Sequence, residues 1–154
     1  MTHIIRPIEM QDLPQAFGLL KDLIRQENIG RPLKMTLELM GQELFAPNAT
    51  WYGLVAAQDT EIIGLCLYSI AHTSRPLNPT PLIQIDDFYV HPNFRRQKIG
   101  EKLIESLTKI AHQSGISRIE LWCVKNNNMG QSFYQKMGAQ KLDHIDVYRF
   151  NLDQ

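Results

Sequence analysis

Hydrophobic positions follow two different periods along the chain, and these periods separate helices from strands. In four stretches the apolar residues recur every three or four positions, which is the spacing of one face of a helix. The pattern predicts helices over residues 13–24, 36–44, 99–111 and 129–137. Asp12, with Gln15 three positions later, is typical of a helix N-cap with a capping box. Gly115 and Gly138 follow two of the predicted helices as C-terminal stops.

Other stretches are rich in β-branched and aromatic residues and are bounded by turn residues, as strands are. Strands are predicted over residues 3–8, 51–57, 61–71, 82–90 and 118–124, and a final antiparallel hairpin over residues 140–142 and 145–152. The order strand, helix, strand from residue 82 to residue 124 predicts two parallel strands joined by a crossover helix. The sequence therefore predicts an α/β fold with a mixed sheet.

Length and charge limit the kind of protein this chain can be. Its 154 residues fit one domain, and 16 basic residues against 16 acidic ones give a formal net charge of +0. A neutral domain lacks the positive field of a dedicated nucleic-acid-binding protein. No apolar run approaches the ~18–20 residues of a membrane helix, and the first residues lack the pattern of a secretory signal. Cys66 and Cys123 lie in apolar runs, so we expect free thiols and a cytoplasmic location.

A basic loop separates the strand predicted over residues 82–90 from the helix predicted over residues 99–111. Arg95, Arg96 and Lys98 stand where that helix begins, and Gly100 lies in its first turn. The first turn of a helix presents unpartnered N–H groups and the positive end of the helix dipole. Together these features are typical of a pocket for phosphate or pyrophosphate. The alternative is a helix start whose charges simply face water.

Several segments resemble one enzyme superfamily, in the same order along the chain. The sequence RRQKIG at residues 95–100 resembles the acyl-CoA signature of the GNAT N-acyltransferases. Asn127, followed by FYQKMGA at residues 133–139, resembles their second CoA segment, and IDDFYV at residues 85–90 is similar to the spermidine/spermine and thialysine N-acetyltransferase branch. Several positions depart from the pattern, among them Met129 and Gly130, which replace the Pro-Ala or Pro-Ser often seen after the asparagine. Lys98 replaces the first signature glycine, and Asp86 stands where the polyamine branch has glutamate.

The resemblance implies both a fold and a reaction. The implied fold is a single N-acetyltransferase domain over residues 1–154, with a GNAT-like mixed, mostly antiparallel sheet and the four predicted helices around it. Its central parallel strand pair is splayed at the cofactor site. The implied reaction is acetyl transfer from acetyl-CoA to a primary amine, in a homodimer. The implied contacts with acetyl-CoA are Phe88, Tyr89, Val90, Arg95, Arg96, Gln97, Lys98, Ile99, Gly100, Glu101 and Asn127.

Two adjacent carboxylates form the predicted acceptor site. An alkylamine has a pKa of ~10, so a base must remove its proton before it can attack a thioester at neutral pH. We predict Asp86 as that base and Asp87 as a second carboxylate that binds the acceptor. Neighbouring residues of a regular strand point to opposite faces, so a local bulge is needed to redirect one of them. The alternative is a strand end held by a salt bridge with Arg95 or Arg96.

Further roles follow from the resemblance. Backbone N–H groups from Phe88 to Val90 would stabilise negative charge on the thioester oxygen. Tyr134 corresponds to the superfamily's general acid for the leaving thiolate, whereas by pattern alone it is an aromatic residue of a helix core. Asn127 would bind the pantetheine or pyrophosphate arm, and otherwise serves as a turn residue. Glu27 matches a carboxylate that contacts the acceptor in the polyamine branch.

Other functions stay open at this point. The paired carboxylates and the basic loop favour a small cationic acceptor, such as a polyamine or a lysine analogue. An acetyltransferase acting on protein N termini or lysines uses the same chemistry. Lys98 in the signature and Met129-Gly130 after Asn128 also fit a domain that binds acyl-CoA without catalysis. The five histidines lack the spacing of metal ligands, so no metal is predicted.

Overall fold

The computed structural model describes residues 2–153 and divides into two compact units. The first unit comprises residues 1–122, and the second comprises residues 123–154. That the two units form one domain stays a prediction.

The first unit is built on a five-stranded sheet with the strand order β1-β2-β3-β4-β5. All neighbouring strands are antiparallel except β4 and β5, which are parallel. The prediction of a mixed, mostly antiparallel sheet with a parallel pair is therefore confirmed. The strands are β1 (Ile4–Pro7), β2 (Trp51–Gln58), β3 (Glu61–Ala71), β4 (Leu82–Val90) and β5 (Ile119–Leu121).

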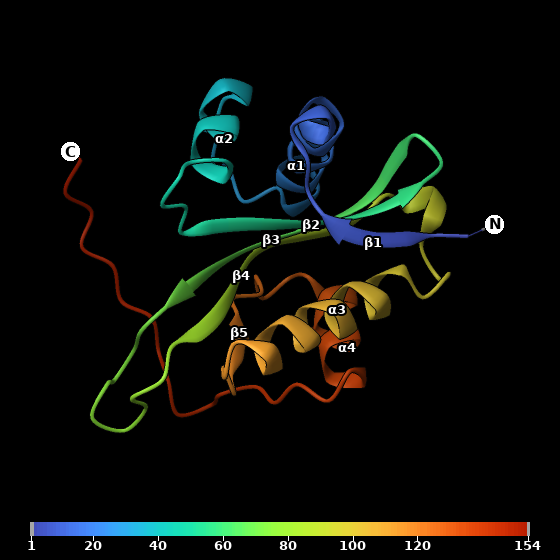
Figure 1. Cartoon of the computed structure of the whole chain (residues 1–154). Coiled ribbons are helices and arrows are strands. Elements are labelled where there is room, and N and C mark those ends of the chain that lie inside the picture. The colour runs from blue at the N-terminus through green and yellow to red at the C-terminus, as the bar shows by residue number, and fades with distance from the viewer. Residues whose placement is uncertain (1, 154) are drawn as a thin grey trace. The chain divides into compact units, whose positions relative to one another are not determined.

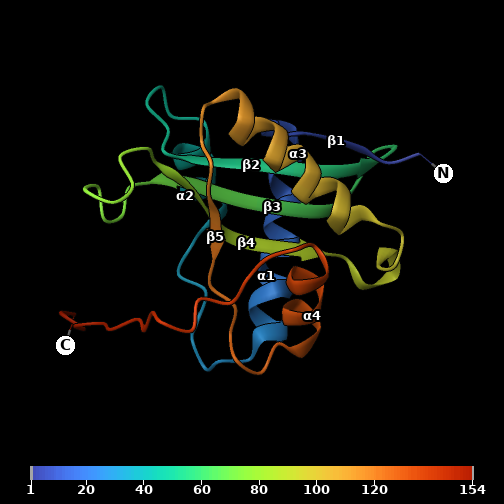
Figure 2. The same ribbon diagram turned by 90° about the horizontal axis from the view of Figure 1, so that it is seen from below.

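Helices cover both faces of this sheet (Figure 1). On one face lie α1 (Leu13–Glu27) and α2 (Leu37–Leu44), and on the other lies α3 (Ile99–Gln113). Figure 2, the view from below, shows that α3 crosses the strands. Two short 3-10 helices, η1 (Met10–Asp12) and η2 (Pro92–Phe94), come before α1 and α3 in the chain.

Each face of the sheet has its own hydrophobic core, because side chains alternate between the two faces of a strand. Leu65 and Leu67 of β3 pack in the core with α1 and α2. Between them, Cys66 packs in the core with α3. Cys66 is fully buried, and burial raises the pKa of its thiol, so it acts as a small hydrophobic residue as predicted.

The start of α1 differs from the predicted N-cap. The Asp12 carboxylate makes no cap hydrogen bond. It accepts two hydrogen bonds from the Arg6 guanidinium, at 2.6 and 3.0 Å, and one from the Glu9 N–H at 2.8 Å. Gln15 also leaves the predicted capping box, since its Oε1 accepts from the Ile62 N–H of β3 at 2.8 Å. Asp12 is the N-cap residue of α1 as predicted, but the predicted capping hydrogen bonds are absent, because Arg6 offers Asp12 stronger, charge-assisted bonds.

The second unit contains one helix, α4 (Asn128–Lys136), and no strand among residues 123–153. Gly138, with a φ of 95°, follows the end of the helix as predicted. The predicted hairpin over residues 140–142 and 145–152 is wrong. An alternating pattern becomes a strand only where a neighbouring strand completes its backbone hydrogen bonds, and the described part of this unit supplies none.

Candidate active site

The pairing of β3 with β4 contains one extra residue. Leu67 of β3 lies opposite Asp87. The next pair is Tyr68 with Ile85, which leaves Asp86 without a residue opposite it. This is a β-bulge, in which an additional residue on one strand changes the direction of the side chains that follow. The bulge that the two carboxylates require is therefore present.

The bulge turns both carboxylates toward the face of the sheet that carries α1 and α2. Asp87 lies opposite Leu67, and residues directly opposite each other in an antiparallel pair share a face. The Asp86 Oδ2 accepts a hydrogen bond from the Ser69 hydroxyl at 2.5 Å. Ser69 is two residues from Leu67 in β3 and therefore lies on the same face. Neighbouring residues of a regular strand would have been separated by the sheet.

The two carboxylates have different proton affinities. Burial raises the pKa of Asp87 to about 6, and the negative charges of Asp86 and Glu27 act in the same direction. Burial also raises the pKa of Asp86 above its ordinary value, and hydrogen bonds from Ser69 and Trp51 limit this rise. A general base works best when its pKa lies near the operating pH, so Asp87 is the better match of the two.

Glu27 joins the pair from α1, where it is the last helical residue. Its charge acts on Asp87, and burial raises its own pKa. The structure thus brings together Glu27, Asp86 and Asp87, the three residues predicted on the acceptor side. These three residues are the acidic cluster.

The β4 strand continues beyond its parallel pairing with β5. The pairing joins Ile83–Ile85 to Ile119–Leu121, whereas β4 runs on to Val90. The His91 N–H donates to the Ile63 carbonyl of β3 at 2.9 Å. Because N–H directions alternate along a strand, the Val90 N–H points away from β3, toward the side where the pairing with β5 has ended. This is the predicted splaying of the parallel pair.

The loop between β4 and α3 has a left-handed backbone at two positions. Arg96 and Lys98 each have a φ of 63°, which glycine adopts freely and other residues rarely adopt. Lys98, which replaces a signature glycine, thus has a backbone conformation that favours glycine. The side chains of Arg96, Gln97 and Lys98 are exposed, and Lys98 is the N-cap residue of α3 without a side-chain capping hydrogen bond. A loop that leads backbone N–H groups and cations into a helix start suits an anion.

Arg95 makes contacts with three protein groups, and its predicted contact with acetyl-CoA stays a prediction. Its Nε donates to the Val90 carbonyl at 2.8 Å, and its Nη2 donates to the Gln26 Oε1 at 2.7 Å. The guanidinium also lies over the Tyr89 ring, 5.2 Å from the ring centroid. These contacts hold the end of α1 against the end of β4. The geometry therefore favours a positioning role for Arg95 and leaves the exposed cations of the loop, Arg96 and Lys98, for an anion.

The alternative role for Asp86 and Asp87 was a salt bridge with a nearby arginine at the end of the strand. Within residues 2–153, neither Asp86 nor Asp87 is ion-paired with Arg95 or Arg96. The Asp86 carboxylate is held instead by the Ser69 hydroxyl. The acidic cluster therefore keeps its negative charge for a ligand.

The remaining predicted residues lie in the second unit. The Asn127 Oδ1 accepts from the Gly130 N–H at 2.9 Å and caps α4, so this oxygen has the turn role that was the alternative reading. A Cβ at Gly130 would lie 2.4 Å from the Asn127 Nδ2, which explains the glycine after Met129. Tyr134 makes an edge-on contact with Phe133, with ring centroids 5.4 Å apart. The roles of Asn127 and Tyr134 toward a cofactor stay predictions.

Comparison with known families identifies the chain. Residues 18–139 match the acetyltransferase (GNAT) family. The chain belongs to this family. The resemblance based on residues 85–100 and on the segment after Asn127 is thereby confirmed, and the protein is an acyltransferase of the N-acetyltransferase type.

Proteins similar to this GNAT acetyltransferase have names that refer to chemically different amines. It is similar to the thialysine N-epsilon-acetyltransferase of Bos taurus, with 26% identity over 93% of this chain and 87% of the relative. It is also similar to the human spermidine/spermine N(1)-acetyltransferase-like protein 1, with 23% identity over 97% of this chain and 23% of that protein. The solved structure of the aminoglycoside acetyltransferase AAC(6')-Iy with a bisubstrate analogue has a TM-score of 0.81 and 21% identity, and the match covers 98% of this chain and 99% of that one. The structural likeness supports the GNAT fold.

Three residues of this GNAT site were missed by reasoning from sequence. Ser69 and Trp51 both donate to Asp86, and Gln26 holds Arg95. Ser69 and Trp51 face each other across β2 and β3, so the hairpin register would have put them together. No signal in the sequence relates either of them to Asp86, because that contact depends on the bulge.

Membrane-spanning helices and metal sites are two further features on which the sequence made predictions. In residues 2–153, no helix combines the length and the apolar character needed to cross a bilayer. The same residues contain no group of three or more His, Cys, Asp or Glu side chains that could hold a metal ion. His91 has a turn role, because its Nδ1 accepts a hydrogen bond from the Asn93 N–H at 3.1 Å.

Proposed function

We propose that this protein transfers the acetyl group of acetyl-CoA to a primary amine of a small cationic molecule. The observation that carries the proposal is the acidic cluster, whose Asp86 and Asp87 lie on the strand that leads into the basic loop. Carboxylates attract an ammonium group, and the loop before α3 attracts phosphate. One continuous segment therefore offers opposite charges to two different substrates.

The basic loop fits the diphosphate of acetyl-CoA. Arg96 and Lys98 are exposed, and their left-handed backbone directs the chain into the first turn of α3, which includes Ile99, Gly100 and Glu101. Main-chain N–H groups at such a turn bind phosphate oxygens, and the two cations add charge. Bound there, acetyl-CoA supplies the activated acyl group as a thioester.

Asp87 is our choice for the base that deprotonates the amine. Its raised pKa, about 6, lets it accept a proton near neutral pH more readily than an ordinary carboxylate. Asp86, which the sequence favoured as the base, is exposed and receives a hydrogen bond from Ser69. We assign Asp86 and Glu27 to binding the charged acceptor.

The remaining steps concern the thioester itself. The Val90 N–H, directed away from β3, is our candidate donor to the carbonyl oxygen as it gains negative charge. When the bond between carbon and sulfur breaks, the Tyr134 hydroxyl would give its proton to the thiolate and regain one from solvent. A tyrosine has a reference pKa of ~10 and is a proton donor at neutral pH.

The named substrates of the relatives support an amine acceptor. Thialysine and aminoglycosides are amines, and so are spermidine and spermine. Each carries at least one ammonium group near neutral pH, which the acidic cluster suits. A homodimer, which rests on the resemblance, and a cytoplasmic location, which rests on the free cysteines, are part of the same proposal.

Release of free thiol from acetyl-CoA tests this function directly. With a panel of diamines, amino acids, polyamines and aminoglycosides, at least one class should give amine-dependent thiol release with saturation kinetics. Tight binding of acetyl-CoA in calorimetry without thiol release from any amine would show a non-catalytic domain. Thiol release with peptides alone would show a protein acetyltransferase.

A further inference from the structure

Two side chains from other strands hold the Asp86 carboxylate. Trp51 of β2 lies opposite Ser69 of β3, and Ser69 lies opposite Gln84 of β4. The bulge brings Asp86 beside this row, where the Ser69 hydroxyl donates to its Oδ2 at 2.5 Å and the Trp51 indole N–H also donates to it. A hydrogen bond of that length is typical of a hydroxyl that donates to an ionised oxygen. Two donors from neighbouring strands therefore converge on one carboxylate.

Asp87, the next residue, has no such donor. Among residues 2–153, neither a hydrogen bond nor an ion pair reaches its side chain. Burial and the negative charges of Asp86 and Glu27 raise its pKa. When two carboxylates lie close together, one of them ionises less readily, and hydrogen bonds to the charged form favour ionisation of the residue that receives them. The difference between the two aspartates therefore originates in β2 and β3.

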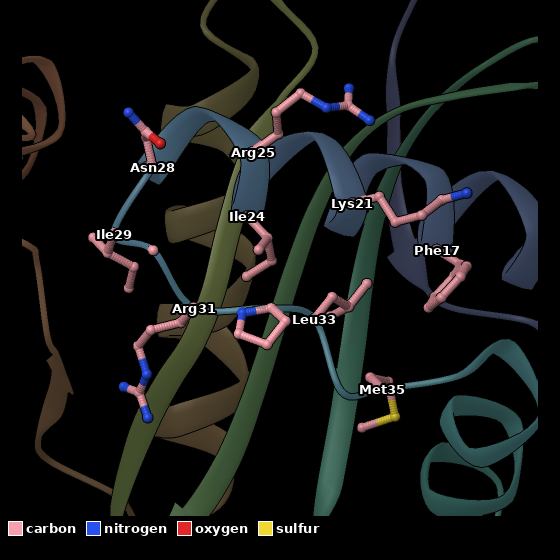
Figure 3. Close-up of a pocket in the computed structure, with 11 residues that line it drawn as sticks. Phe17, Lys21, Ile24, Arg25, Asn28, Ile29, Arg31, Leu33 and Met35 are labelled. Atoms are coloured by element: carbon pink, nitrogen blue, oxygen red, sulfur yellow. The ribbon is translucent and has the colours of Figure 1, made fainter.

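The cations of α1 do not neutralise the pair. Figure 3 shows Lys21 and Arg25 extending from α1, and both line the cleft between this helix and residues 29–35. Neither aspartate lines that cleft, and the two cations contact a phenyl ring and a carboxylate of α1 itself. The residue of α1 that acts on the pair is Glu27, which is negative. This helix therefore adds negative charge to the pair.

Charges on the neighbouring strands are compensated or absent. Glu120 of β5 is ion-paired with Arg118, with 3.0 Å between Oε2 and Nη1. Cys66 of β3 packs in the core on the other face of the sheet. Burial raises the pKa of its thiol, so the sulfur is uncharged at neutral pH. Stabilisation of a negative charge on Asp86 therefore depends on the two donors from β2 and β3.

We infer that Ser69 and Trp51 are positioning residues for acetyl transfer: they hold Asp86 as the ionised carboxylate that binds the acceptor ammonium, and so leave proton removal to Asp87. The inference rests on the proposed function, which places the ammonium at the acidic cluster. Without these donors Asp86 would compete with Asp87 for a proton, and a neutral carboxyl attracts an ammonium less than a carboxylate does. The donors thereby assign different roles to two adjacent residues of the same type.

Carboxyl NMR titration of the full chain tests this division without turnover. With carbon-13 in the aspartate carboxyl groups, the two signals are assigned by their loss in Asp86→Asn and Asp87→Asn. Asp86 should titrate at lower pH than Asp87. Ser69→Ala should move the Asp86 titration to higher pH, as should Trp51→Phe, which keeps a ring and loses the N–H donor. Ser69→Thr, which keeps the hydroxyl, should not move it.

Two results of this titration would overturn the inference. One is an Asp86 that titrates above Asp87 in the unchanged protein. The other is an Asp86 titration that stays in place in both Ser69→Ala and Trp51→Phe. Because the two variants remove donors from different strands, failure of one of them to fold leaves the other to decide.

Kinetics locate the effect at the acceptor. With the amine that releases thiol fastest, Ser69→Ala should lower kcat/KM about fivefold at pH 6, the size of one ordinary hydrogen bond. The loss should be smaller at pH 8, because Asp86 is then ionised with or without the donor. In the Asp86→Asn background the same substitution should cause no further loss. Gln84→Ala, which removes a polar side chain opposite Ser69, should leave kcat/KM unchanged.

These outcomes separate the inference from the proposed function. If no amine releases thiol, the proposed reaction fails, and the NMR titration still decides whether the two donors set the charge of Asp86. If an amine is acetylated, an equal loss at pH 6 and pH 8 in Ser69→Ala would overturn the inference. The same loss in the Asp86→Asn background would also overturn it, because Ser69 would then act on the fold and not through Asp86.

Discussion

The acidic cluster and the basic loop belong to one stretch of chain, but their chemistry arises in different ways. In the loop, the backbone conformations of a few consecutive residues, with Arg96 and Lys98 left-handed, set the direction of the N–H groups. In the cluster, Glu27 comes from α1 and the two aspartates come from a bulge in β4. The loop is a local structure, whereas the cluster exists only when helix and sheet are packed. A single substitution should therefore act on different quantities in the two regions.

Removing the charge of Asp87 should have the largest effect. Asp87→Asn cannot accept the proton of the amine, and loss of a general base costs about 10²–10⁴ in rate. In the unchanged protein, kcat/KM should fall tenfold per pH unit below a pKa of about 6, because protonated Asp87 is not a base. That acid limb should be absent from the variant. A pH profile of kcat/KM with the best amine measures both.

Asp86→Asn is the matched control for this prediction. It should raise KM for the acceptor and keep an acid limb, shifted to lower pH because one negative neighbour of Asp87 is gone. Thermal unfolding provides the second control. The raised pKa of Asp87 means that its ionisation costs folding free energy above about pH 6, so Asp87→Asn should be more heat-stable at pH 7. If Asp86→Asn abolished the limb and Asp87→Asn did not, the two roles would be exchanged.

The same contrast separates what the sequence could predict from what it could not. The bounds of β3 and β4 and the basic loop were predicted because strand pattern and loop residues are local signals. The bulge was stated as a requirement of the chemistry, and nothing in residues 85–90 encodes its position. The predicted capping hydrogen bond of Asp12 and the predicted C-terminal hairpin are both absent for the same physical reason. In both cases a partner outside the predicted element, present or missing, decides the structure.

Charge in the loop should affect the cosubstrate alone. Arg96→Gln removes an exposed cation, which on a phosphate contact is worth about 1 kcal/mol, or roughly a fivefold rise in KM for acetyl-CoA. The effect should shrink in high salt, since screening weakens exposed charge pairs. Arg95→Gln, by contrast, should lower thermal stability because it breaks the contacts with Val90 and Gln26. Equal effects of the two variants on KM for acetyl-CoA, without loss of stability in Arg95→Gln, would contradict this distinction.

Backbone strain in the loop should appear in stability. Lys98 adopts a φ of 63°, which costs a non-glycine residue about 1 kcal/mol. Lys98→Gly should therefore increase the free energy of unfolding by up to about that amount, measured by urea denaturation, because the freer unfolded glycine offsets part of the gain. Lys98→Ala, which loses the charge but keeps the strain, should show no increase. A gain in both variants would trace the effect to charge.

The smallest effect is expected at Glu27, where the cluster depends on packing between α1 and β4. Its charge helps to raise the pKa of Asp87, so Glu27→Gln should move the acid limb of kcat/KM to lower pH. The variant also loses a contact with the acceptor, which would lower kcat/KM at every pH. The informative quantity is therefore the ratio of kcat/KM at pH 5.5 to kcat/KM at pH 8, in which a constant loss cancels. We expect that ratio to rise by about twofold, the size of a screened interaction between partly buried charges.

Asp22→Asn, on the same helix but paired with Arg25, should leave the ratio unchanged. A ratio that stays constant in Glu27→Gln would mean that Asp87 owes its proton affinity to burial and to Asp86, and that α1 supplies the acceptor site with a contact and no electrostatic tuning.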